Sequence, residues 1–131
     1  MNYKISNELI EEIIGIDLKE LEVSIDNNII KIFNYDIELC DYTIKHQESI
    51  NDFFFKCKNW AFKEGYELSS GYHIYGLQYK GHKDANKIYC DCRYYNNDEI
   101  QVRRFFANTE QQCIFDACQW IHDNNKKENK Q

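Results

Sequence analysis

The residues of this sequence best suited to metal chemistry are four cysteine and histidine side chains in its second half. Cys90 and Cys92 alternate on one predicted strand, and Cys118 and His122 lie one turn apart on one predicted helix. Zinc binds four such ligands tetrahedrally, although this spacing differs from the paired C-x2-C pattern of ribbons and knuckles. All six cysteines fall on or beside apolar faces, where a free thiol acts as a small hydrophobic side chain. We expect core thiols, with a zinc site as the alternative.

A second group combines arginines with aromatic rings on a predicted hairpin. Its members are Arg93, Arg103, Arg104, Tyr89, Tyr95 and Phe105. Guanidinium groups hold phosphates and aromatic rings stack on bases, so this combination suits a nucleotide or RNA. The simpler alternative is that the arginines pair with Asp91 and Glu99 across the hairpin.

The motifs of common enzyme and nucleotide-binding sites are missing from the sequence. It contains no G-x-S-x-G nucleophile elbow, no Walker-type phosphate loop and no G-x-G-x-x-G turn. A catalytic thiol needs a partly exposed, electropositive setting, and the sequence points to none. We therefore expect a binding protein with neither enzymatic activity nor a cofactor.

Acidic residues are concentrated at the start of the chain. Residues 1–48 contain eleven acids and four bases, a net charge of −7, whereas residues 49–131 contain eleven acids and twelve bases, a net charge of +1. Such a field attracts basic protein surfaces and disfavours direct binding to a nucleic-acid duplex. Ordinary solvated faces are the alternative interpretation. The acids that we expect to form a contact surface are Glu8, Glu11, Glu12, Asp17, Glu20 and Glu22.

The chain has the size and composition of one folded domain. Its 131 residues are 43% hydrophobic and 15% aromatic, which is enough to build a core. No run approaches the length of a membrane span, and the acidic start is unlike a secretory signal. We expect a cytoplasmic protein that does not bind membranes and whose thiols stay reduced. The predicted domain covers residues 1–123, and a frayed polar tail covers residues 124–131.

In the first half, the pattern predicts a helix over residues 7–14, capped by Ser6 and ended by Gly15. A hairpin is expected from residues 21–25 and 29–35. Residues 36–48 show no clean period and are expected to form irregular chain or a third short strand.

In the second half, a helix is expected to begin after Ser49 and to end near Gly65. Residues 66–79 look strand-like, and residues 88–95 and 100–106 form a hairpin. A three-residue turn would pair Cys92 with Val102 and Asp91 with Arg103. The last helix follows a capping box at Thr109 and Gln112. The order of helix, hairpin, helix, three-stranded meander and helix predicts an α+β domain, an antiparallel sheet layered with α-helices.

Three segments carry a family resemblance: residues 8–15 (ELIEEIIG), the helix from Ser49 that ends at Glu64-Gly65-Tyr66, and residues 106–118 (FANTEQQCIFDAC). Together they resemble the small phage proteins of the phage ABA sandwich domain family, in which a sheet is layered between helices. The resemblance implies a phage or prophage accessory protein without a catalytic motif.

Small phage accessory proteins of this kind include inhibitors of bacterial defence. The implied partner is a host protein or ribonucleoprotein defence complex, such as a CRISPR effector, bound through the acidic surface. This step is an analogy, because a fold does not fix a function. Amphipathic helices and tyrosine-rich edges are also compatible with a homodimer.

Overall fold

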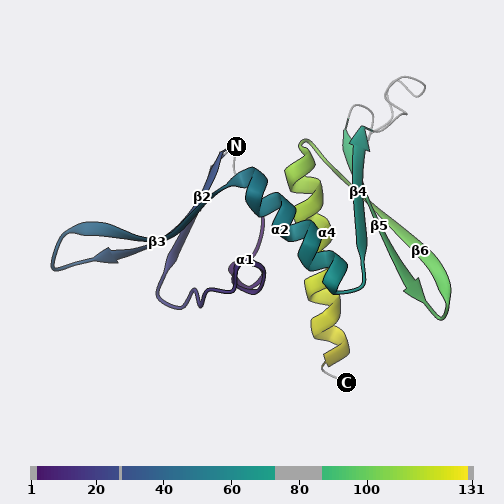
Figure 1. The fold of residues 1–131 in the computed structure, drawn as a ribbon, viewed down its shortest axis with the longest axis horizontal. Helices are drawn as coiled ribbons and strands as arrows, with labels where there is room; N and C mark the ends of the chain where they lie inside the picture. Colours follow the sequence, from purple (N-terminus) through teal and green to yellow (C-terminus); the bar gives the residue numbers. More distant parts are fainter. Residues whose placement is uncertain (1–2, 27, 73–86, 130–131) are drawn as a thin grey trace. The chain divides into compact units, whose positions relative to one another are not determined.

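The computed structural model describes residues 3–26, 28–72 and 87–129, and it has the predicted α+β fold, with antiparallel sheets layered against helices (Figure 1). Its contacts divide the chain into two compact units, Met1–Lys56 and Cys57–Gln131. Each unit contains one three-stranded antiparallel sheet. Helix α2 (Ile50–Lys63) begins in the first unit and ends in the second. The assignment of residues 1–123 to a single domain stays a prediction.

Helix α1 (Asn7–Ile14) opens the first unit and has both predicted caps. The Ser6 hydroxyl accepts a hydrogen bond from the Leu9 amide at 3.2 Å. Gly15 ends the helix in the left-handed conformation, with φ at 83°, and its amide donates to the Glu11 carbonyl at 2.7 Å. Because glycine lacks a Cβ atom, this conformation costs it little. The cap therefore fixes where the chain leaves the helix.

The sheet of the first unit consists of β1 (Glu22–Ile25), β2 (Ile29–Asp36) and β3 (Asp41–Ser49). The predicted β1–β2 hairpin is confirmed. Where irregular chain or a short strand was expected, β3 is a nine-residue strand paired along the whole of β2. The turn between β2 and β3 is organised by Asp36, whose carboxylate accepts hydrogen bonds from the amides of Glu38 at 2.9 Å and Leu39 at 3.3 Å.

A register shift divides the β2–β3 pair into two parts. Ile30 and Ile32, opposite Glu48 and His46, are fully buried. Beyond the shift Phe33 lies opposite Ile44, so β3 has one extra residue at this point. Successive side chains of a strand point to opposite faces. The side chain of Phe33 therefore lies on the face of β2 opposite to that of Ile32.

In the second unit, helix α4 (Glu110–Asn129) packs across the sheet formed by β4 (Glu67–Tyr72), β5 (Ile88–Asn96) and β6 (Glu99–Ala107) (Figure 1). The predicted N-cap is present, with Thr109 Oγ1 accepting from the Gln112 amide at 3.1 Å. The side-chain amide of Gln112 donates to Asp116 at 2.7 Å. A further bond joins helix and sheet, because Cys113 Sγ donates to the Ile88 carbonyl at 3.0 Å.

The β5–β6 register differs by one residue from the prediction. Asn97 and Asp98 both have positive φ, 53° and 64°, and form a two-residue turn. Asparagine and aspartate tolerate this conformation, and such a turn matches the twist of a hairpin better than the three-residue turn expected. Cys92 consequently pairs with Arg103, and Asp91 with Arg104.

The end of α4 also differs from the expected frayed tail, because the helix continues from residue 124 to residue 129. Asn124 Nδ2 donates to the Tyr66 hydroxyl at 3.5 Å, and Asn125 Nδ2 donates to Glu64 at 3.1 Å. Residues 130–131, and the part of the predicted strand over residues 73–79, lie outside the described residues. In the described part of the chain, no helix is both long and apolar enough to cross a membrane.

We predict that Gly15→Ala lowers the free energy of unfolding by about 1 kcal/mol, because an alanine Cβ disfavours the left-handed conformation. No atom beyond its two chain neighbours lies within 4 Å of the position that a Cβ would take, so the cost comes from the backbone conformation. Gly15→Asn should cost less, because asparagine tolerates this conformation. Urea denaturation of the two variants measures the difference, and equal losses would contradict the explanation.

Candidate functional site

Three of the six predicted contact acids lie together in the first unit. Glu8, Glu11 and Asp17 line a shallow depression of about 360 Å³ beside the end of α1, with Asn7, Leu18 and Lys19. Glu11 Oε1 accepts a hydrogen bond from the Leu18 amide at 2.7 Å, and Asp17 Oδ1 accepts from the Lys19 amide at 2.9 Å. These two carboxylates are therefore fixed in position by hydrogen bonds from backbone amides of the segment that follows α1.

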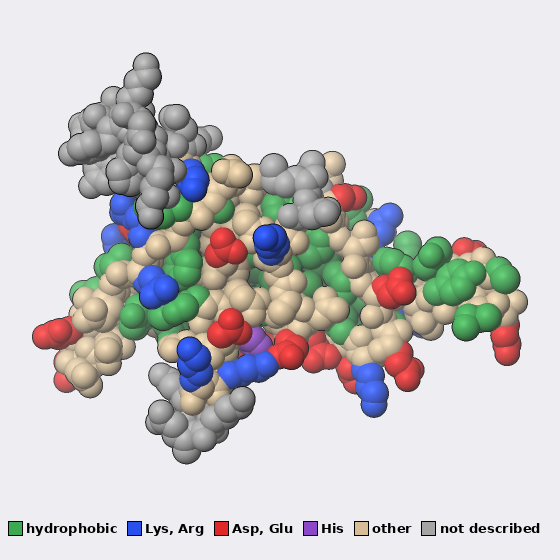
Figure 2. Space-filling model, turned by 180° about the vertical axis from the view of Figure 1, so that it is seen from behind, with side chains coloured by type: hydrophobic (Ala, Val, Ile, Leu, Met, Phe, Trp, Pro, Cys, Tyr) green, Lys and Arg blue, Asp and Glu red, His purple; other side chains and the backbone are tan. Residues whose placement is uncertain are grey.

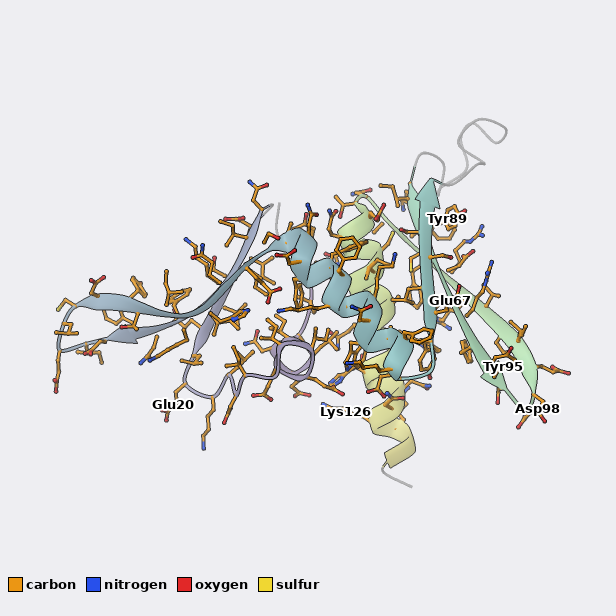
Figure 3. All side chains as sticks on the ribbon, viewed as in Figure 1. Glu20, Glu67, Tyr89, Tyr95, Asp98 and Lys126 are labelled. Carbon is orange, nitrogen blue, oxygen red and sulfur yellow. The ribbon has the colours of Figure 1, made fainter. Side chains whose placement is uncertain are left out.

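The other three predicted acids are exposed and do not line the depression. Glu12 lies on α1, and Glu22 is the first residue of β1. Glu20 lies in the segment between α1 and β1, with φ at 66° (Figure 3). The six predicted contact acids thus form one group of three and three further exposed positions in the same unit.

The arginine and aromatic group is divided between the two faces of the second sheet. Arg103 lies on the α4 face, with its guanidinium carbon 5.0 Å from the centre of the Trp120 ring and 5.5 Å from that of Phe105. Arg104 lies on the opposite face and is held by Asp91, with Nε–Oδ1 at 2.6 Å and Nη2–Oδ2 at 2.9 Å. Its guanidinium also covers the Tyr89 ring at 4.2 Å.

Only Arg93 and Tyr95 of the predicted nucleotide-binding residues lie in one groove. The groove has a volume of about 410 Å³, and its lining residues are Phe62, Gly65, Tyr66, Glu67, Arg93, Tyr94, Tyr95 and Ile100. Tyr95 lies near the turn that carries Asp98, whereas Tyr89 lies toward the other end of the sheet (Figure 3). The pairing of Asp91 with an arginine was expected as the simpler alternative, but the partner is Arg104. A nucleotide would therefore meet one cation of the three.

The described residues give the zinc alternative no support. No group of three or more histidine, cysteine, aspartate and glutamate side chains among them is arranged to hold a metal ion. Cys90, Cys92 and Cys118 are buried core residues, as is His122. Cys118 Sγ donates a hydrogen bond to the Cys57 carbonyl at 3.5 Å, inside the second unit.

Burial also makes the thiols of Cys90, Cys92 and Cys113 poor nucleophiles. Loss of water around Cys92 raises the pKa of its thiol to about 12, and burial raises the pKa of Cys113 to about 11. The pKa of Cys90 is raised further, first by burial and then by the neighbouring thiols of Cys113, Cys92 and Cys118. The thiolate is the reactive form, so these side chains stay inert near neutral pH.

Two features of the first unit escaped the sequence analysis. The first is a buried carboxylate: Glu48 Oε1 lies 2.6 Å from His46 Nε2 and 2.9 Å from Lys56 Nζ. The second is a set of exposed apolar side chains on the β2–β3 hairpin. The alternation of Tyr42 and Ile44 with polar residues was the sequence signal for β3. The turn before it interrupts the alternating pattern, so the pairing of β3 with β2 was not predicted.

The comparisons with protein-family models, with curated proteins and with solved structures find no match to this chain. The resemblance to the phage ABA sandwich domain family therefore stays a prediction.

We predict that one thiol of six reacts with Ellman's reagent in the folded protein and that all six react after unfolding in guanidinium. Cys40 is the only exposed cysteine, and the other five are buried. Cys40→Ser should abolish the reaction of the folded protein. Rapid reaction of a second thiol would contradict the buried arrangement.

We predict that Arg104→Ala lowers the free energy of unfolding by about 2 kcal/mol, because it leaves the buried Asp91 carboxylate without its bidentate partner. Arg93→Ala is the matched control on the same hairpin and should change stability little, because Arg93 is exposed and is not the partner of the buried Asp91 carboxylate. Urea denaturation measures both variants. Equal effects would show that the Asp91–Arg104 pair contributes nothing specific.

Proposed function

We propose that this chain is a phage-derived, non-enzymatic inhibitor that binds a host nucleic-acid-handling defence complex, of the CRISPR effector type, through the acidic surface of its first unit. One observation carries the proposal: the excess of acids coincides with a structural unit. Residues 1–56 contain twelve acids and five bases, which places a net charge of −7 in the first unit.

The arrangement of the acids suits contact with a basic surface. Glu11 and Asp17 are fixed by backbone amides beside Glu8, so they need little ordering when a partner arrives. A protein channel that holds nucleic acid is lined by lysine and arginine, which neutralise phosphates. Carboxylates presented on a folded surface compete for the same cations.

Charge alone does not explain tight binding. Exposed ion pairs contribute about 0.2–1 kcal/mol each, and salt screens them. Their main effects are a faster encounter and the exclusion of wrong partners. A stable complex therefore needs apolar contacts in addition to the acids.

The test uses a panel of purified CRISPR effector ribonucleoproteins and the triple variant Glu8→Lys, Glu12→Lys and Glu22→Lys. Glu11 stays unchanged because its carboxylate holds the Leu18 amide. For a complex that binds the protein, we expect the triple variant to bind about tenfold more weakly or worse, and the wild type to weaken as salt is added. Biolayer interferometry at two ionic strengths measures both effects.

A matched control reverses three exposed acids of the second unit, Glu67→Lys, Glu99→Lys and Asp123→Lys. It makes the same change in total charge, so an effect of net charge alone would weaken both triple variants equally. Unchanged affinity in the first-unit variant, or absence of binding across the panel, would overturn the proposal.

A further inference from the structure

The β2–β3 hairpin of the first unit exposes apolar side chains that the fold of that unit leaves uncovered. Within residues 33–44, which we call the hairpin tip, the exposed large apolar side chains are Tyr35, Ile37, Leu39, Tyr42 and Ile44. Figure 2 shows apolar side chains gathered along this hairpin, with acidic side chains beside them. Singly exposed apolar residues are common, but a contiguous group of them marks an interaction surface.

The strand part of the hairpin tip has one apolar face. Phe33 pairs with Ile44, and Tyr35 pairs with Tyr42, so all four side chains lie on the same side of the hairpin. The Tyr42 ring lies 5.1 Å from Phe33 and 4.8 Å from Tyr35, measured between ring centres. Because successive residues of β2 point to opposite faces, this face is opposite to the one that buries Ile32, and the extra residue of β3 places Ile44 and Tyr42 on it. The tip thus carries a second apolar surface.

The turn part presents two aliphatic side chains in a fixed geometry. Ile37 is 80% exposed and Leu39 is 71% exposed. The Asp36 carboxylate holds the turn through two backbone amides, and Cys40 completes it in a left-handed conformation, with φ at 50°. A loop ordered before binding loses less entropy when it docks.

The charges of the hairpin tip select the kind of partner. Residues 33–44 contain Asp36, Glu38 and Asp41 but no lysine or arginine. A second copy of the chain would bring equal charges together, and an anionic membrane surface would repel the tip. A protein surface with basic residues around an apolar groove complements both its apolar face and its charge.

We propose that the hairpin tip is the apolar anchor of the complex and inserts into an apolar groove rimmed by lysine and arginine on a partner protein. The inference deepens the proposed function and rests on it for the basic character of the partner. Interfaces of this kind depend on a few central apolar residues, while the surrounding charges set the encounter rate and specificity. Ile37 and Leu39 are those central residues.

The first probe is a fluorescein-labelled amphipathic helical peptide of leucine and lysine, which supplies an apolar stripe between basic residues. Fluorescence anisotropy measures its dissociation constant. Ile37→Ser with Leu39→Ser should weaken binding about tenfold or more, since two anchors are truncated. Both residues are exposed, so the variant should keep its fold, which circular dichroism checks.

The second unit offers a matched control, Ile100→Ser with Val102→Ser. These side chains are 64% and 55% exposed on the β5–β6 hairpin, and the variant makes a similar loss of apolar surface elsewhere. Its affinity for the peptide should stay within about twofold of the wild type. Equal weakening by both double variants would mean that exposed apolar surface binds the peptide without preference, which overturns the proposal.

The position of the peptide is read from Cys40, the one exposed cysteine of the chain, which lies in the turn. Bound peptide should slow the alkylation of this thiol by iodoacetamide. Mass spectrometry measures the rate of this reaction. Binding that leaves the alkylation rate unchanged would place the peptide elsewhere and overturn the proposal.

Two further peptides separate this proposal from the proposed function. Serine in place of leucine should abolish binding, and glutamate in place of lysine should also abolish it. If the serine–lysine peptide binds as tightly as the leucine–lysine peptide, the anchor is excluded, while the acidic surface keeps its role. If none of the peptides binds, the anchor is excluded, and the charge-reversal experiment still decides the proposed function separately.

Two other occupants of the hairpin tip are tested directly. Sedimentation of the wild type should show a monomer, and a dimer that Ile37→Ser with Leu39→Ser dissociates would show that a second copy covers the tip. Vesicles of phosphatidylcholine should leave the alkylation rate of Cys40 unchanged. Protection by these vesicles would identify a lipid surface as the occupant. Either result overturns the proposal.

Discussion

The register shift between Ile32 and Phe33 determines which side chains of β3 share a face with the aromatic end of β2. Strand residues alternate between faces, so with an unbroken register Phe33 would lie opposite Lys45, and Ile44 would share the face of Ile32. The extra residue in β3 instead lets the pairs Phe33–Ile44 and Tyr35–Tyr42 form on the other side of the hairpin. One strand therefore serves the interior near its start and an exposed surface near its end.

The charge of the first unit and the exposed apolar face complement each other. Acids attract a basic surface over distances of about the Debye length but contribute little energy once salt and water screen them. Buried apolar area contributes binding free energy, but it carries no charge and discriminates little between partners. In the proposed complex, an apolar tip flanked by acids would combine a steering field with a source of affinity.

The sequence predicted the elements better than their pairing. Ser6, Gly15 and Thr109 act through local backbone contacts, so their caps were readable from a few neighbouring residues. The partner of Asp91 depends on whether the turn at Asn97 has two residues or three, a choice that the side-chain pattern left open. The pairing of β3 was equally hard to predict. It depends on the turn after β2, in which the Asp36 carboxylate accepts hydrogen bonds from the amides of Glu38 and Leu39.

The candidate site was likewise predictable in its composition but not in its spatial arrangement. A surplus of acids can be counted along the chain, but the meeting of Glu8 with Asp17 depends on how the chain turns after Gly15. The sequence spacing suggested that four side chains could bind one zinc ion. The fold instead uses the cysteines among them as core side chains.

Small side chains line the contact between α4 and its sheet, and this has a consequence for how the chain can vary. Cys113, Ala117 and Cys118 are fully buried on the helix, and Cys90 and Cys92 are fully buried on the strand beneath it. Interiors are close-packed, so a bulkier side chain at any of these positions must displace the helix. Exchanges between alanine and cysteine, which change the side-chain volume little, should therefore be tolerated in this layer better than any larger residue.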